Sequence, residues 1–278
     1  QRQMCIRDRD GSPKILEFNA DTPTSLLEAS VIQWQWKEDV FPECDQFNGI
    51  HEGLVQSWKD IFPKKGEIHF AGALENNEDT GTLQYLASTA MEAGFSTRVL
   101  DMQALDLQNG RFFDPAGELV NRCFKLYPWE WMVDESPDGC LAEMEWLEPI
   151  WKLVMSNKAI LATLYELFPD SPYVLPCYLS RPRSGLFCKK PIFSREGHNV
   201  SVVDIRDWEE YVRIAETEGD YNTGAYVYQE YVEPTAYSGR YPVIGSWIIG
   251  GEAAGIGIRE NRMEVTDNLS EFVPHIIG

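Results

Sequence analysis

The chain has 278 residues, of which 44% are hydrophobic and 12% aromatic, which is enough for a packed core in one large domain or two ordinary ones. Asp and Glu total 44 against 24 Lys and Arg, and the resulting net charge of −20 argues against a nucleic-acid backbone or an anionic membrane surface as a partner. A polycationic substrate would suit this balance. Because no apolar run approaches the roughly 20 residues that span a bilayer, we expect a soluble, cytoplasmic protein.

The cysteines and histidines show no metal-binding spacing. No two cysteines form a CxxC pair, and the histidines form no HExxH motif. The pattern therefore favours free thiols in a reducing compartment and argues against a transition-metal site.

The first nine residues, QRQMCIRDR, differ from the rest of the chain. Asp10-Gly11 is a hairpin signal and is followed by a predicted strand at 14–19, so a partner strand should precede it. The polar, charged string there has little β character and is similar to translated adaptor sequence. We therefore expect 1–9 to be non-native and 10–278 to be the natural body, with its true N-terminus missing; an intact gene carrying the same string would contradict this.

The predicted strand 14–19 places Glu17 and Asn19 on one face, because strand side chains alternate. A polar turn with Asp21, Thr22 and Thr24 follows. Thr24 or Ser25 is suited to cap a helix whose apolar positions are Leu26, Leu27, Val31 and Trp34, and a second helix is expected over about 46–61.

A βαβ unit is predicted next, from a buried strand at 67–74, a helix at 82–93 and a strand at 96–100. Parallel strands bind ligands at their carboxyl ends and at helix N-termini, which is where the segment 75–80 falls. A small hairpin is expected over 112–119.

The last third of the sequence indicates β structure after a helix that opens at Asn157-Lys158. A hairpin over 187–204 carries Lys189 and Lys190, and its polar tip at 194–197 is suited to a polyphosphate because oriented N–H groups and cations stabilise clustered negative charge. Taken alone, the tip is better interpreted as a solvated surface turn. A strand at 225–231 and a strand pair at 246–249 and 253–259 complete the pattern.

Five motifs in this order resemble the glutathionylspermidine synthase family, in particular its shorter bacterial members without an amidase domain. The motifs are EFNADTPTSLLE, SNKAILATLYELFP, KPIFSREGHNV, YVYQEYVEP and IGSWIIGGEAAGIGIREN. The resemblance implies an α/β (α+β) ATP-grasp fold, with a βαβ, pre-ATP-grasp-like substrate subdomain at about 66–122 and a nucleotide clamp at about 150–278.

The resemblance also implies roles for individual residues. Glu17 and Asn19 would be ligands of Mg²⁺, which prefers oxygen donors. Arg259 would stabilise the transferring phosphoryl group, and an exposed ion pair with Glu260 is its alternative role. The ATP contacts would be Lys158, Lys190, Ser194, Arg195, Glu196, Gly197, Gln229, Glu230 and Val232, and the substrate contacts Thr22, Thr24 and Glu78.

The sequence departs from the family pattern at two places. The family has an Arg for the substrate and an Asp for magnesium on the strand before Glu17, and counting back reaches Gln3 and Cys5. The threonines that contact glutathione correspond to Leu126 and Trp131. These departures put glutathione itself in question.

The function implied is an ATP- and Mg²⁺-dependent carboxylate–amine ligase that forms an acyl phosphate. Its partners would be a small-molecule or peptide carboxylate and an amine, with a polyamine among the candidates. The alternative is a catalytically impaired nucleotide-binding protein with a binding or regulatory role. Neither the two substrates nor the oligomeric state follows from the sequence.

Overall fold

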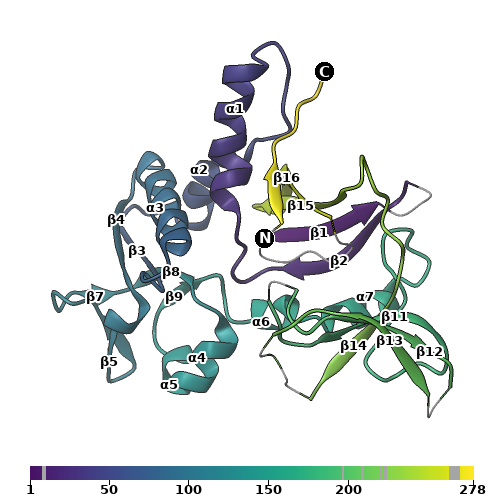
Figure 1. Ribbon diagram of the computed structural model, residues 1–278. Helices are drawn as coiled ribbons and strands as arrows, with labels where there is room; N and C mark the ends of the chain where they lie inside the picture. Colours follow the sequence, from purple (N-terminus) through teal and green to yellow (C-terminus); the bar gives the residue numbers. More distant parts are fainter. Residues whose placement is uncertain (8–10, 196, 208–209, 220, 222–223, 263–269) are drawn as a thin grey trace.

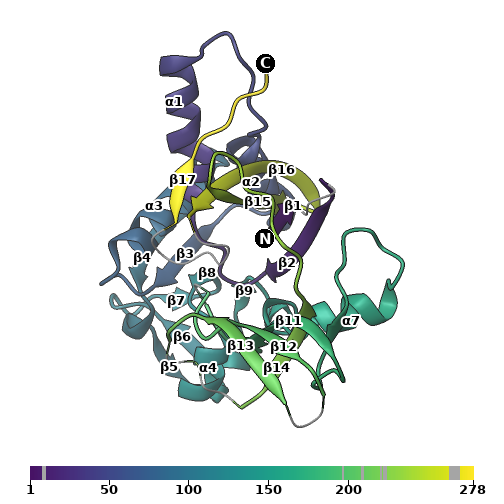
Figure 2. The same ribbon diagram turned by 45° about the vertical axis from the view of Figure 1, so that its right-hand side comes forward.

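The computed structural model describes residues 1–7, 11–195, 197–207, 210–219, 221, 224–262 and 270–278. Their elements form a βαβ region, a central antiparallel sheet and a second antiparallel sheet (Figure 1). Figure 2 shows the second sheet lying below the central one, with the βαβ region beside both.

The βαβ region confirms the predicted unit, with a helix that begins at Asn77 and not at Thr82. β3 (Glu67–Gly72) lies parallel to β4 (Ser96–Asp101) on one side and to β8 (Arg122–Leu126) on the other, and β9 (Glu145–Leu147) extends the sheet. α3 (Asn77–Glu92) connects β3 to β4 and begins after Asn76, whose side chain accepts the Glu78 N–H as an N-cap.

The core of the βαβ region lies between its sheet and two helices. α2 (Ile50–Ile61) begins four residues later than expected and packs with α3 against the buried Ile68, Phe70 and Leu83. The predicted small hairpin is confirmed as β6 and β7. The smaller elements of this part of the chain are η2 (Met102–Ala104), β5 (Asp106–Gln108), β6 (Arg111–Phe113), β7 (Leu119–Val120), α4 (Trp129–Glu135) and α5 (Pro137–Cys140).

The central sheet has the order β17-β16-β15-β1-β2 and places a strand in the first residues, as the partner expected before the Asp10-Gly11 turn. β1 (Arg2–Arg7) pairs antiparallel with β2 (Pro13–Asn19) and with β15 (Tyr241–Ile249), so a strand occupies the segment that has little β character in the sequence. Arg2, Met4 and Ile6 of this strand line a cavity, where the Arg2 guanidinium donates to the Thr24 carbonyl. The other strands are β16 (Glu252–Asn261) and β17 (Glu271–Val273).

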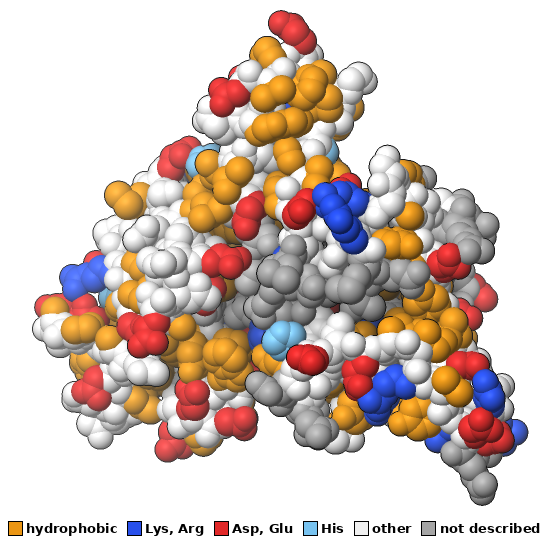
Figure 3. Space-filling model, in the orientation of Figure 1, with side chains coloured by type: hydrophobic (Ala, Val, Ile, Leu, Met, Phe, Trp, Pro, Cys, Tyr) orange, Lys and Arg blue, Asp and Glu red, His pale blue; other side chains and the backbone are white. Residues whose placement is uncertain are grey.

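The helix after β2 does not bury all of its predicted apolar positions. A π-helical segment, η1 (Glu28–Ile32), precedes α1 (Gln33–Val40), and its wider turns shift the side chains around the axis. Leu26 is buried as predicted, but the side chains of Val31 and Trp34 are 43% and 44% exposed. Figure 3 shows the resulting hydrophobic surface on the protruding top of the molecule, where Figure 1 places α1.

The second antiparallel sheet has the order β10-β14-β11-β12-β13. Its predicted hairpin is confirmed as β11 (Gly185–Pro191) and β12 (Ser201–Ile205), and β11 also pairs with β14 (Tyr226–Glu230). The predicted helix after Lys158 is confirmed as α7 (Ile160–Leu167). The remaining elements are α6 (Lys152–Ser156), β10 (Cys177–Tyr178) and β13 (Tyr211–Glu216).

Among the residues that the structure describes, the helices are too short or too polar to cross a bilayer.

Candidate active site

A cavity of about 570 Å³ lies where the central sheet, the β11–β12 hairpin and the start of α3 meet. It gathers every sequence-predicted site residue that the structure describes. Glu196 lies outside the described residues. The predicted residues that line the cavity are Glu17, Asn19, Thr22, Thr24, Glu78, Lys158, Lys190, Ser194, Arg195, Gly197, Gln229, Glu230, Val232 and Arg259.

The two predicted ATP lysines enter the cavity from different elements. Lys158 lies between α6 and α7, and its Nζ donates to the Ser194 carbonyl at 2.6 Å. Lys190, on β11, donates to the Leu16 carbonyl at 3.0 Å and to Gln229 Oε1 at 2.7 Å. Both side chains are largely buried, at 9% and 6% exposure, so each ammonium group is held in place and partly desolvated.

Glu17 and Asn19 extend from β2 on the cavity face, as their spacing predicts. Burial alone would raise the pKa of Glu17, but Lys158, Lys190 and Arg2 outweigh it and hold that pKa below its usual range. Conversely, burial and the neighbouring Lys190 lower the pKa of Lys158, although Glu17 opposes that shift. The site is therefore a buried cluster of lysines around one ionised carboxylate.

Gln229 links the two antiparallel sheets. Its side chain, 2% exposed, accepts from Lys190 and donates to the Ile15 carbonyl at 2.9 Å. This expected ATP contact thus connects β14 to β2 in the structure. Glu230 and Val232 line the cavity directly after it.

Arg195 connects the tip of the β11–β12 hairpin to the opposite wall. Its guanidinium donates to Thr22 Oγ1 at 2.7 Å and to Glu130 Oε1 at 2.5 Å. Glu130 belongs to α4 and was missed by sequence reasoning, because 65 residues separate it from Arg195 and no local pattern marks it.

The three predicted substrate contacts, Thr22, Thr24 and Glu78, all line the cavity. Thr22 is 5% exposed. Thr24 lines the cavity, and its carbonyl accepts from Arg2 Nη1 at 2.8 Å. Glu78 is in the first turn of α3, at the end of the cavity formed by the βαβ region.

Arg2 is a second residue that the sequence analysis missed. A register shift between Met4 and Cys5 places Arg2 opposite Asn19 and Met4 opposite Glu17, and both Arg2 and Met4 line the cavity. Counting back by a regular spacing, which reaches Gln3 and Cys5, is therefore wrong by one position. Arg2 lies at the same end of the cavity as Arg259 of β16.

Leu126 and Trp131, which correspond to the family's glutathione-contacting threonines, have packing contacts instead. Leu126 is 5% exposed and belongs to the core of the βαβ region. Trp131 packs its ring edge-on against Tyr127, with centroids 5.3 Å apart.

Residues 5–278 match the family described as glutathionylspermidine synthase preATP-grasp. A Haemophilus influenzae protein named "Putative acid–amine ligase" is 38% identical over 276 residues, which cover 94% of this chain and 70% of that protein. A trypanothione synthetase from Crithidia fasciculata is 28% identical over 292 residues, covering 93% of this chain and 44% of the relative. The chain thus spans less than half of the second relative.

The fold is similar to that of a glutathione synthetase-like effector from Globodera pallida, solved in its apo form. The TM-score is 0.59 at 10% identity, and the match covers 100% of this chain and 75% of that chain. Identity this low supports the fold alone. Because the family match extends over nearly the whole sequence, the chain belongs to the glutathionylspermidine synthase preATP-grasp family.

Proposed function

We propose that the protein is an ATP-dependent carboxylate–amine ligase that works through an acyl phosphate. The observation that carries this proposal is the convergence of Lys158, Lys190 and Arg259 with the acidic strand face of Glu17 and Asn19 in one cavity. Relatives named as an acid–amine ligase and as a trypanothione synthetase support the same reaction class.

ATP would bind between the two antiparallel sheets. Lys158 and Lys190 would contact phosphate oxygens as point charges, and Ser194 and Gly197 would cover the phosphates from the hairpin tip. The adenine would lie along the end of β14, where Glu230, Tyr231 and Val232 line the cavity.

Mg²⁺ would be held by Glu17 and Asn19 together with the phosphates. These two residues fit a shared site, because Mg²⁺ commonly keeps few protein ligands and completes its shell with phosphate and water. The described residues contain no group of three or more His, Cys, Asp or Glu side chains that could hold a metal ion without the nucleotide. The ion would neutralise phosphate charge during transfer.

The reaction would proceed in two steps. A substrate carboxylate oxygen attacks the γ-phosphorus and ADP leaves; an amine nitrogen then attacks the acyl carbon, phosphate leaves, and the nitrogen gives up a proton. Arg259, with Arg2 nearby, would offset the charge that develops on the phosphoryl oxygens. No side-chain nucleophile is needed.

The acid substrate would lie between the loop after β2 and the start of α3. Thr22 and Thr24 offer hydroxyl groups to its carboxylate, and Glu78 offers a carboxylate to an ammonium group on the same molecule. The cavity lining also contains Glu28 and Asp79, and the amine substrate would lie near these carboxylates. Their negative charge suits a cationic amine.

The test is ADP release measured with a panel of peptide carboxylates and polyamines, with the Haemophilus relative assayed in parallel. The proposal predicts ADP release that requires both a carboxylate and an amine, and that yields one amide per ADP. ATP binding without amine-dependent ADP release across the panel would contradict ligase activity and favour a binding or regulatory protein.

A further inference from the structure

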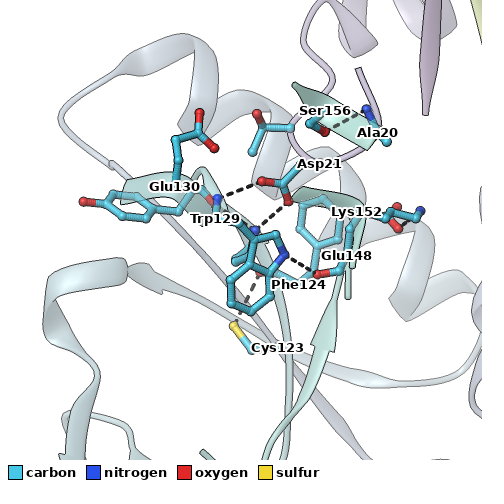
Figure 4. A network of polar contacts seen from close by, with 12 residues as sticks. Ala20, Asp21, Cys123, Phe124, Trp129, Glu130, Glu148, Lys152 and Ser156 are labelled. Atoms are coloured by element: carbon cyan, nitrogen blue, oxygen red, sulfur yellow. Dashed lines mark hydrogen bonds and ion pairs between the residues drawn. The ribbon is translucent and has the colours of Figure 1, made fainter. Parts of the chain in front are cut away.

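The carboxylate of Asp21 is buried at the junction between the loop after β2 and the βαβ region. The Asp21 side chain is 1% exposed. Oδ1 accepts from Lys125 Nζ at 2.6 Å. Oδ2 accepts from the backbone N–H of Trp129 at 2.8 Å (Figure 4). One carboxylate therefore ties this loop to the end of β8 and to the first residue of α4.

Lys125 is itself held rigidly. It is 0% exposed, donates to the Tyr127 carbonyl at 2.8 Å, and places its Nζ 4.2 Å from the centroid of the Trp129 ring. The loop is fixed on its other side as well, because the Ala20 N–H donates to Ser156 Oγ at 3.1 Å (Figure 4). Asp21 thus has few alternative positions.

The two hydrogen-bond acceptors of Arg195 come directly after Asp21 and Trp129 in the sequence. Thr22 follows Asp21, and Glu130 follows Trp129. The guanidinium of Arg195 donates to both, at 2.7 and 2.5 Å. The contacts of Asp21 consequently set how far apart these two acceptors lie.

We propose that the Asp21–Lys125 pair is a positioning device that holds Thr22 and Glu130 at the spacing required to receive Arg195, and so docks the β11–β12 hairpin over the cavity. The consequence for turnover rests on the proposed ligase function, whereas the docking itself does not.

A buried charged pair is better suited to positioning chain segments than to stabilising the fold. Desolvation offsets much of the attraction between buried charges, and apolar side chains of similar volume often replace such pairs without loss of stability. What apolar residues cannot supply is direction: two hydrogen bonds to one carboxylate fix its plane and its distance from two chain segments.

The test replaces the pair with apolar side chains of similar size, in the variant Asp21→Leu/Lys125→Met. We expect thermal unfolding close to that of the wild type, together with amide hydrogen exchange at least about tenfold faster in peptides from the β11–β12 turn. Exchange in the core peptides of β3 and α3 should not change.

Two further variants separate positioning from general loosening. Glu130→Gln weakens the Arg195 contact directly, so it should speed exchange in the same turn, and adding it to the double variant should give little further increase. Glu145→Gln removes an ion pair with Arg122 at the opposite end of β8 and should leave the turn unchanged.

Unchanged exchange in the turn of a folded double variant would overturn the proposal, as would full additivity with Glu130→Gln. If the double variant does not fold, Asp21→Asn, which keeps an acceptor for the Trp129 N–H, takes its place; exchange equal to the wild type would again refute the inference. Exchange can be measured whether or not ADP is released, so failure of the ligase assay is distinguishable from failure of this proposal.

Discussion

Lys158 Nζ lies 3.5 Å from Glu17 Oε2, so a lysine from the segment before α7 is paired with a carboxylate on the central sheet. In the proposed function the lysine contacts phosphate and the carboxylate contacts magnesium. Mg-ATP would therefore separate the two groups and replace their mutual contact with one partner each. The same pair explains how a buried carboxylate stays ionised before any ligand binds.

Lys190→Met should weaken nucleotide binding by about 10- to 100-fold, which corresponds to the loss of a charge-assisted hydrogen bond of about 1.5–3 kcal/mol. Calorimetric titration with a non-hydrolysable ATP analogue measures the change. Lys189→Met is the matched control, because the Lys189 ammonium lies over the Tyr226 ring, 3.9 Å from its centroid. Equal affinity in the wild type and Lys190→Met would contradict the assigned contact.

Arg259→Ala should mainly lower turnover, by about 10²- to 10³-fold, while ATP affinity stays within about threefold, because its charge is needed chiefly when phosphoryl charge develops. Steady-state ADP release and equilibrium binding of the ATP analogue together separate the two effects. A loss of affinity as large as the loss of turnover would instead make Arg259 a ground-state nucleotide contact.

The local patterns of this sequence predict its elements well. The βαβ unit, the β11–β12 hairpin and the shared face of Glu17 and Asn19 each depend on residues close in sequence, whose periodicity is preserved in the fold. The gathering of the candidate side chains in one cavity could be expected only through the family resemblance, because composition and spacing do not place distant strands together.

The features that escaped prediction depend on irregular backbone or on distant partners. A register shift in the β1–β2 pair moved Arg2 to the cavity face, and a π-helical segment turned Val31 outward. Glu130 is part of the site because it accepts from Arg195, and Lys125 is buried beside the site because it donates to Asp21, 104 residues away. Tertiary contacts of this kind leave no periodic signal in one sequence.

Gly72→Ala should destabilise the protein by about 1–3 kcal/mol through overpacking at the end of β3. An added Cβ would lie 2.9 Å from Leu83 Cδ1 and 3.1 Å from the Leu126 carbonyl oxygen, and the backbone carbonyl cannot readily move aside. Gly66→Ala is the control, since its nearest neighbour is the flexible end of Arg122 at 3.4 Å. Urea unfolding of both variants measures the difference, and equal losses would argue against close packing at Gly72.

His69→Gln should make stability less dependent on pH between 7 and 5. Burial lowers the pKa of His69 from its ordinary 6.5; Glu67 and Asp114 oppose the shift, and Arg98 adds to it. Below pH 6.5 the unfolded chain therefore binds more protons at this residue than the folded chain, so wild-type stability falls as the pH falls.

The His69→Gln variant lacks this titrating group. Its free energy of unfolding should therefore decline less steeply with falling pH, and its slope should differ from that of the wild type by up to about 1.4 kcal/mol per pH unit. Urea unfolding at pH 7, 6 and 5 measures both slopes. Glu67→Gln is the companion variant: it removes a carboxylate that opposes the shift, so its decline should continue to lower pH than that of the wild type. Identical slopes in the wild type and His69→Gln would mean that His69 does not carry the acid sensitivity.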